Sequence, residues 1–159
     1  MRLSVFILAN IEPILAEWDV FARKIWPGKY TDPAELRDHA ENILRAAALD
    51  MQTRQTDAQQ DAKSIGEGRN QTAASSSVDW ASGVHALARL DSGFDLLAVF
   101  AEYRALRASV IRLWRDSGPN PDLHDLDDLT RFNESIDQSL TEAVRKYVYE
   151  VASFRGRAG

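Results

Sequence analysis

The chain of 159 residues contains no cysteine. Disulfides, thiolate zinc sites and cysteine nucleophiles all need that side chain, so the sequence excludes these three kinds of chemistry. Basic residues are also in the minority, at 19 against 24 acidic ones, which gives a formal net charge of −5. A nucleic-acid surface needs clustered Lys and Arg to displace counterions, so this charge argues against a nucleic-acid partner.

Long apolar runs are missing as well. No window approaches the roughly 18 apolar residues that a membrane-spanning helix needs. The apolar start of the chain, MRLSVFILA, is followed by no small-x-small cleavage site, which a secretory signal would carry. We therefore expect no membrane span, no secretory leader and a cytoplasmic location.

Apolar residues recur at spacings of three and four along most of the chain, which is the period of amphipathic helices. No segment shows the alternation that is typical of a strand. The pattern predicts an all-α fold, either a bundle or a globin-like stack of five or six helices with a long C-terminal helix. We expect one helical domain over residues 1–155 and a tail over 156–159. The predicted helices cover about residues 3–9, 11–25, 33–51, 78–90, 94–114 and 124–154.

Residues 53–77 have a different composition. Gln, Asp, Ser, Thr, Gly and Asn dominate this segment, and Ile65 is its one large aliphatic residue. Such a segment buries too little apolar area to offset the entropy lost on ordering. The sequence predicts a flexible loop here, with a short helix over 57–64 as an option.

Two pairs of polar residues suggest a binding site for a small anion. His85 and Arg89 are four residues apart, and so are Tyr103 and Arg107 on the next predicted helix. Residues four apart share a helix face, and a tight connection would place the two helices side by side. Trp18 is a candidate aromatic lining residue. The sequence thus gives a ligand-binding hypothesis of five residues from three helices.

Two other interpretations of these residues stay open. Arg89 or Arg107 can instead pair with Glu102 or Asp95, which would make the group a structural network. In a globin-like protein His85 can also serve as the proximal ligand of a haem. The chain supplies no nucleophile, base and orienting group together, so we expect no catalytic residues, no metal site and no obligatory cofactor.

The end of the long C-terminal helix has a spacing that favours pairing between copies. From Leu140 onward its apolar residues follow a 4-3-4-3 pattern, the spacing of a coiled-coil seam. The pattern covers only two heptads. It predicts a homodimer in which this helix contacts its partner and carries a signal. The seam consists of Leu140, Val144, Tyr147, Val151 and Phe154.

Two strings carry a resemblance to a known family: Arg-Leu-Asp-Ser-Gly-Phe-Asp at residues 89–95 and Glu-Tyr-Arg-Ala-Leu-Arg at 102–107. Together with the segments at 14–18 and 36–44, they resemble the N-terminal sensory domains of bacterial hybrid sensor histidine kinases. Those domains are similar to the N-terminal domain of RsbR-type stressosome proteins. The likeness runs from about residue 6 to 150 and skips the 53–77 segment.

The resemblance implies a globin-like helical domain, usually without haem, that dimerises and passes a signal through its C-terminal helix. The expected function is a non-catalytic signal-input domain of a two-component sensor histidine kinase, with a downstream kinase or another signalling protein as its partner and a small ligand of unknown identity. A haem-binding gas sensor and a stressosome-like interaction scaffold are the alternatives. A phosphoacceptor motif and a nucleotide-binding domain are missing from the sequence, so we expect a sensor fragment or a stand-alone sensor.

Overall fold

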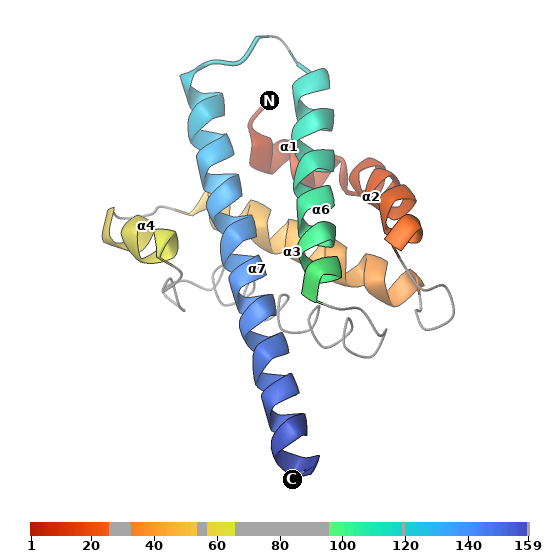
Figure 1. Ribbon diagram of the computed structural model, residues 1–159. Helices are drawn as coiled ribbons and strands as arrows, with labels where there is room; N and C mark the ends of the chain where they lie inside the picture. Colours follow the sequence, from red (N-terminus) through yellow and green to blue (C-terminus); the bar gives the residue numbers. More distant parts are fainter. Residues whose placement is uncertain (26–32, 54–56, 66–95, 119, 159) are drawn as a thin grey trace.

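The computed structural model describes residues 1–25, 33–53, 57–65, 96–118 and 120–158. Over these ranges it contains six α-helices and no strand (Figure 1), which confirms the all-α prediction for this part of the chain. The predicted helix at 78–90 and residues 66–77 of the predicted loop lie outside the described residues. The helices are α1 (Leu3–Ala9), α2 (Ile11–Ile25), α3 (Pro33–Gln52), α4 (Asp57–Ser64), α6 (Leu96–Asp116) and α7 (Leu123–Ala158).

The ends of these helices follow from local chemistry. Asn10 ends α1, because its backbone N–H donates to the Ile7 carbonyl at 3.1 Å and its side-chain amide donates to the Phe6 carbonyl at 2.9 Å. α7 begins with a reciprocal pair of caps. The carboxylates of Asp122 and Asp125 each accept a hydrogen bond from the other residue's backbone N–H at 2.9 Å. These bonds satisfy N–H groups that have no partner inside the helix.

Five of the described helices, α1, α2, α3, α6 and α7, pack around a shared core, and α4 lies against α7 outside it. α6 and α7 run antiparallel and side by side, and α3 crosses behind them (Figure 1). α1 packs mainly on α3, and α2 packs mainly on α6. Most of the apolar side chains that the periodicity assigned to the inner faces of α2 and α3 are buried, and Phe21 and Met51 are half-buried at the edge of the core. The largest fully buried side chains are Leu3, Ile7, Ile14, Leu15, Trp18, Ile43, Leu44, Tyr103, Phe132 and Ile136.

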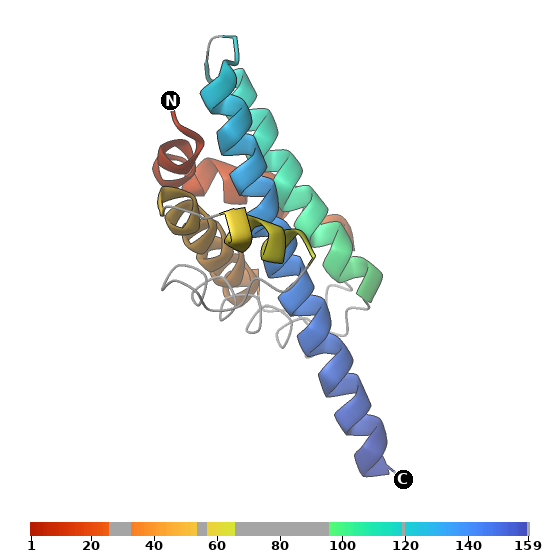
Figure 2. The same cartoon turned by 90° about the vertical axis from the view of Figure 1, so that its left-hand side faces the viewer.

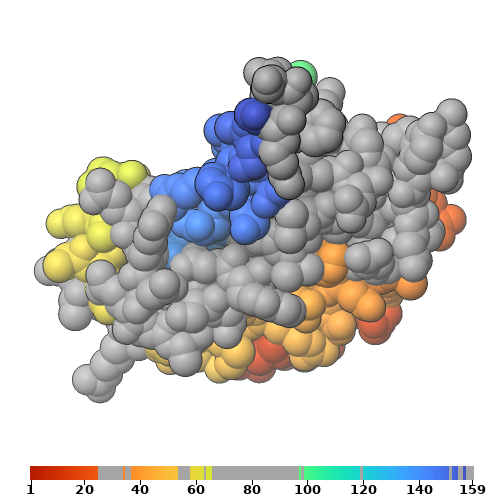
Figure 3. Space-filling model, turned by 90° about the horizontal axis from the view of Figure 1, so that it is seen from below, coloured from red at the N-terminus to blue at the C-terminus, as the bar shows by residue number. Residues whose placement is uncertain are grey.

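α7 is 36 residues long, and its second half extends beyond the other helices (Figures 1 and 2). Ala143 is the last α7 residue whose side chain is described as buried. Seen from below (Figure 3), the end of α7 lies at the surface with α4 on one side and α3 on the other. No helix in the described ranges is long and apolar enough to cross a membrane.

One feature of α7 departs from the sequence prediction. The three- and four-residue spacing of apolar residues along 124–154 predicts Leu126 on the buried side of this helix. Leu126 is instead 56% exposed, whereas Asp128 is only 5% exposed. The face toward the bundle runs through Asp128, Phe132, Ser135 and Ile136, which places Leu126 at its edge in solvent. The inner face of α7 is therefore partly polar. Three of its buried side chains, Asp128, Ser135 and Ser139, form hydrogen bonds with neighbouring helices.

Candidate functional site

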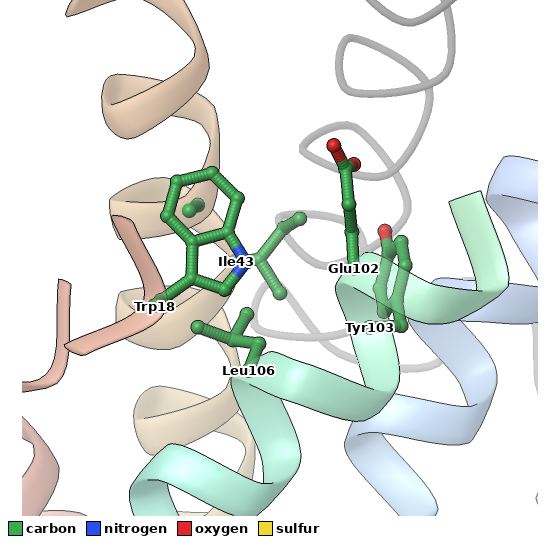
Figure 4. A pocket seen from close by; sticks show the side chains of 6 residues that line it. Trp18, Ile43, Glu102, Tyr103 and Leu106 are labelled. Atoms are coloured by element: carbon green, nitrogen blue, oxygen red, sulfur yellow. The ribbon is translucent and has the colours of Figure 1, made fainter. Parts of the chain in front are cut away.

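The centre of the bundle is a tight contact between α2, α3 and α6. Trp18 of α2 lies next to Ile43 of α3, across from Glu102 and Tyr103 of α6 (Figure 4). The gap between these side chains is too narrow to hold a water molecule. Five of the six lining side chains are mainly apolar, so Glu102, at 1% exposed, is the single carboxylate among them. The lining residues are Trp18, Ala40, Ile43, Glu102, Tyr103 and Leu106.

The structure brings together two of the residues that the sequence assigned to a ligand site. Trp18 and Tyr103 both line this central gap. Arg107 lies one turn beyond Tyr103 on α6, where it is half-buried and forms an ion pair with Asp137 of α7. The structural-network alternative paired Arg89 or Arg107 with Glu102 or Asp95; the structure pairs Arg107 with Asp137, and Asp95 lies outside the described residues. His85 and Arg89 lie outside the described residues.

The inner face of α7 bonds to α3 and α6 through side-chain hydroxyl groups. The hydroxyl oxygens of Tyr103 and Ser139 lie 3.0 Å apart and share a buried hydrogen bond between α6 and α7. One turn earlier, the hydroxyl of Ser135 donates to the carboxylate of Asp50 on α3 at 2.5 Å. Buried polar groups are costly unless they are hydrogen-bonded, so each pair holds α7 at one position against its neighbour.

α7 also closes the C-terminal end of α3. The guanidinium of Arg131 donates to the backbone carbonyls of Asp50 at 2.6 Å and of Thr53 at 3.1 Å. It also lies 3.8 Å from the Asp50 carboxylate. The last carbonyls of a helix have no hydrogen-bond donor inside the helix, and they carry partial negative charge. The guanidinium of Arg131 supplies both the donors and the positive charge.

The start of α7 binds the N-terminal end of α1. The carboxylate of Asp128 accepts a hydrogen bond from the backbone N–H of Leu3 at 2.8 Å. It also accepts two from the guanidinium of Arg2, at 2.9 Å and 2.5 Å. This hydrogen bonding to Asp128 raises the pKa of Arg2 above its ordinary value. A carboxylate at a helix N-terminus is stabilising because the N–H groups and the helix dipole both favour negative charge.

Sequence reasoning did not identify this set of α7 contacts. An acid in the first turns of a helix is expected to stabilise that helix's own dipole, whereas the side chain of Asp128 caps α1. The signal that could have found the set is a run of polar residues at helical spacing inside an otherwise apolar face. The run consists of Asp128, Arg131, Ser135 and Ser139.

Of the predicted signalling residues, Leu140 packs against the core, and Val144 and Tyr147 follow Ala143, the last buried residue of α7. Leu140, Val144 and Tyr147 are half-buried, and beside them Val148 and Tyr149 are exposed. The side chains of Val151 and Phe154 lie outside the described part of the structure.

Within the described ranges, no three His, Asp or Glu side chains are placed to hold a metal ion. Comparison of the chain with protein-family models, curated proteins and solved structures gives no match.

Proposed function

We propose that this chain is a non-catalytic signal-input domain that transmits a change in helix packing through α7 to an output domain. The observation that carries the proposal is the division of α7 into two parts. Its first half is bonded into the bundle, and its second half projects from it (Figures 1 and 2). A helix is stiff over this length, so a displacement of the first half also displaces the second.

The contacts that hold the first half favour a change between two arrangements. α7 is positioned on α3 and α6 by hydrogen bonds from Ser135 and Ser139 as well as by apolar packing. A hydrogen bond of this kind contributes about 0.5–1.5 kcal/mol net, so a second arrangement that gives both groups new partners differs little in free energy from the first. Serine side chains are also small, so they offer little steric resistance when α7 shifts against its neighbours. A stimulus that stabilises one arrangement over the other would then move α7.

The proposal includes a homodimer formed by the projecting half of α7. The 4-3-4-3 spacing from Leu140 to Phe154 would place one apolar stripe of each copy against the other. In such a pair the two projecting helices would continue into the output domain, for which the sequence resemblance suggests a histidine kinase. The proposal places the domain in the cytoplasm, where a kinase has access to ATP.

A chimera tests the relay directly. The chain is joined through α7 to the dimerisation helix and catalytic core of a histidine kinase, in a series with zero to seven residues inserted at the junction. If α7 relays an angular or axial shift, kinase activity varies along the series and returns after seven insertions, since seven residues restore the coiled-coil register. Activity that does not depend on junction length would contradict a relay through α7. The matched control is the same series without residues 1–122.

A further inference from the structure

A surface groove lies between α2 and α6, away from the contacts of α7. Its volume is about 780 Å³, and between its charged side chains it is lined by Val20 and Phe21 of α2 and by three alanines and Ser109 of α6. Val20 is 61% exposed although it is fully apolar. Small side chains allow another backbone to approach closely, so the groove has the shape for a helix. The small residues are Ala101, Ala105 and Ala108.

The rim of this groove carries excess positive charge, although the whole chain has a net charge of −5. Three cations, Lys24, Arg104 and Arg112, face one carboxylate, Glu17. Arg112 forms an ion pair with Glu17. In the part of the chain that the structure describes, Lys24 and Arg104 take part in no ion pair. The groove thus offers an apolar lining with two unneutralised cations beside it.

The first two turns of α7, residues 122–130, have the opposite character; we call them the α7 tip. Leu123 and Leu126 are 78% and 56% exposed, and they lie three residues apart on one helix face. Asp122, Asp125 and Asp127 accompany them, and no Lys or Arg occurs between residues 119 and 130. The tip is an acidic helix with exposed leucines.

We infer that the α2–α6 groove of one copy binds the α7 tip of a second copy. The leucines would cover the alanines, and the carboxylates would lie near Lys24 and Arg104. Opposite charge at the rim favours this pairing, whereas two grooves facing each other would bring cations together. A copy cannot fill its own groove, because α2 and α7 contact opposite sides of α6 (Figure 1).

This contact is separate from the pairing of the projecting α7 halves and does not depend on the proposed function. The two can be measured apart by working in the full chain with V144E and V148E, which place charges on the projecting half of α7, one in the apolar stripe and one beside it. If V144E and V148E by themselves abolish self-association, the groove contact is contradicted. Association unchanged by V144E and V148E would instead contradict the α7 pairing.

Sedimentation velocity in the V144E and V148E background tests the groove contact with two further variants. The groove variant carries K24E and R104E, and the tip variant carries H124K and D127K, which leave the caps of Asp122 and Asp125 in place. We expect the background chain to self-associate at low salt and less so at high salt. Each further variant should weaken self-association by roughly a hundredfold, since like charges would then face each other.

The decisive sample is a mixture of the two variants. The groove variant retains an intact tip and the tip variant retains an intact groove, so the mixture should associate although neither variant does so alone. A background chain that stays monomeric, a variant that associates like its parent, or a mixture that stays monomeric would each overturn the inference. Circular dichroism of every variant verifies that the helical fold is retained.

Discussion

The carboxylate of Asp128, in the second turn of α7, accepts a hydrogen bond of 2.8 Å from the backbone N–H of Leu3, the first residue of α1. The two residues are 125 positions apart in the chain. The start of the long C-terminal helix therefore caps the start of the first helix, and Arg2 completes the contact with two further hydrogen bonds.

Removing this cap should destabilise the fold measurably. Asp128→Ala leaves the N–H of Leu3 without its acceptor in a buried position, and we expect a loss of about 2–3 kcal/mol in the free energy of unfolding. Urea denaturation followed by circular dichroism measures it. Asp127→Ala is the matched control, because Asp127 is exposed, and it should change stability by less than about 0.5 kcal/mol. Equal effects of the two substitutions would show that the contact with α1 contributes nothing.

The hydrogen bond between Tyr103 and Ser139 should appear as a coupling energy in a double-mutant cycle. Tyr103→Phe and Ser139→Ala each remove one hydroxyl, and we expect a coupling of roughly 0.5–1.5 kcal/mol between them. Tyr103→Phe combined with Thr141→Ala serves as the control, since the Thr141 hydroxyl bonds within α7 to the Asp137 carbonyl. Additive effects for the first pair would mean that α6 and α7 are not joined at this point.

Trp18 should be essential for the packing of α2 on α3 and α6. It is fully buried, and the gap beside it admits no water, so Trp18→Ala should open a cavity at a cost of about 3–5 kcal/mol. Indole should bind that cavity and raise the melting temperature of the variant. Thermal unfolding with and without indole measures both effects, with Val20→Ala, an exposed position on the same helix, as the control. Indole that stabilises the wild type equally would contradict a specific cavity.

Much of the fold could be predicted from the sequence, since its local signals agree with one another. The spacing of Ile14, Leu15 and Trp18 predicted the buried face of α2, and each of these side chains is buried. The ends of the elements also followed from local chemistry, because Pro33 is the first residue of α3 and α7 begins immediately after Asp122. Periodicity and capping are determined by residues that are close in the sequence, so both can be predicted from the sequence alone.

The polar contacts of α7 could not be predicted, because their partners are remote in the sequence. Nothing in the local pattern distinguishes an aspartate that stabilises its own helix from one that caps another, as Asp128 does for α1. Arg107 posed the same difficulty. Its nearby acidic residues were the expected partners, but antiparallel packing of α6 on α7 brings Asp137 to it. The prediction for Leu126 was wrong because polar residues occupy part of the inner face.

In the proposed homodimer, α7 pairs with α7 of a second copy and carries a change in the bundle outward. Because the chain has no cysteine, one introduced thiol reports on one position alone. Tyr147 belongs to the 4-3-4-3 stripe, whereas Tyr149, two residues later, lies on another face of α7 and is exposed.

Oxidative cross-linking of the full chain with Tyr147→Cys or Tyr149→Cys therefore tests the pairing most directly. In a parallel pair the two copies of residue 147 come within disulfide reach, and those of residue 149 do not. We predict rapid formation of a covalent dimer for Tyr147→Cys and little for Tyr149→Cys. Equal cross-linking of both variants, or none of either, would contradict the account.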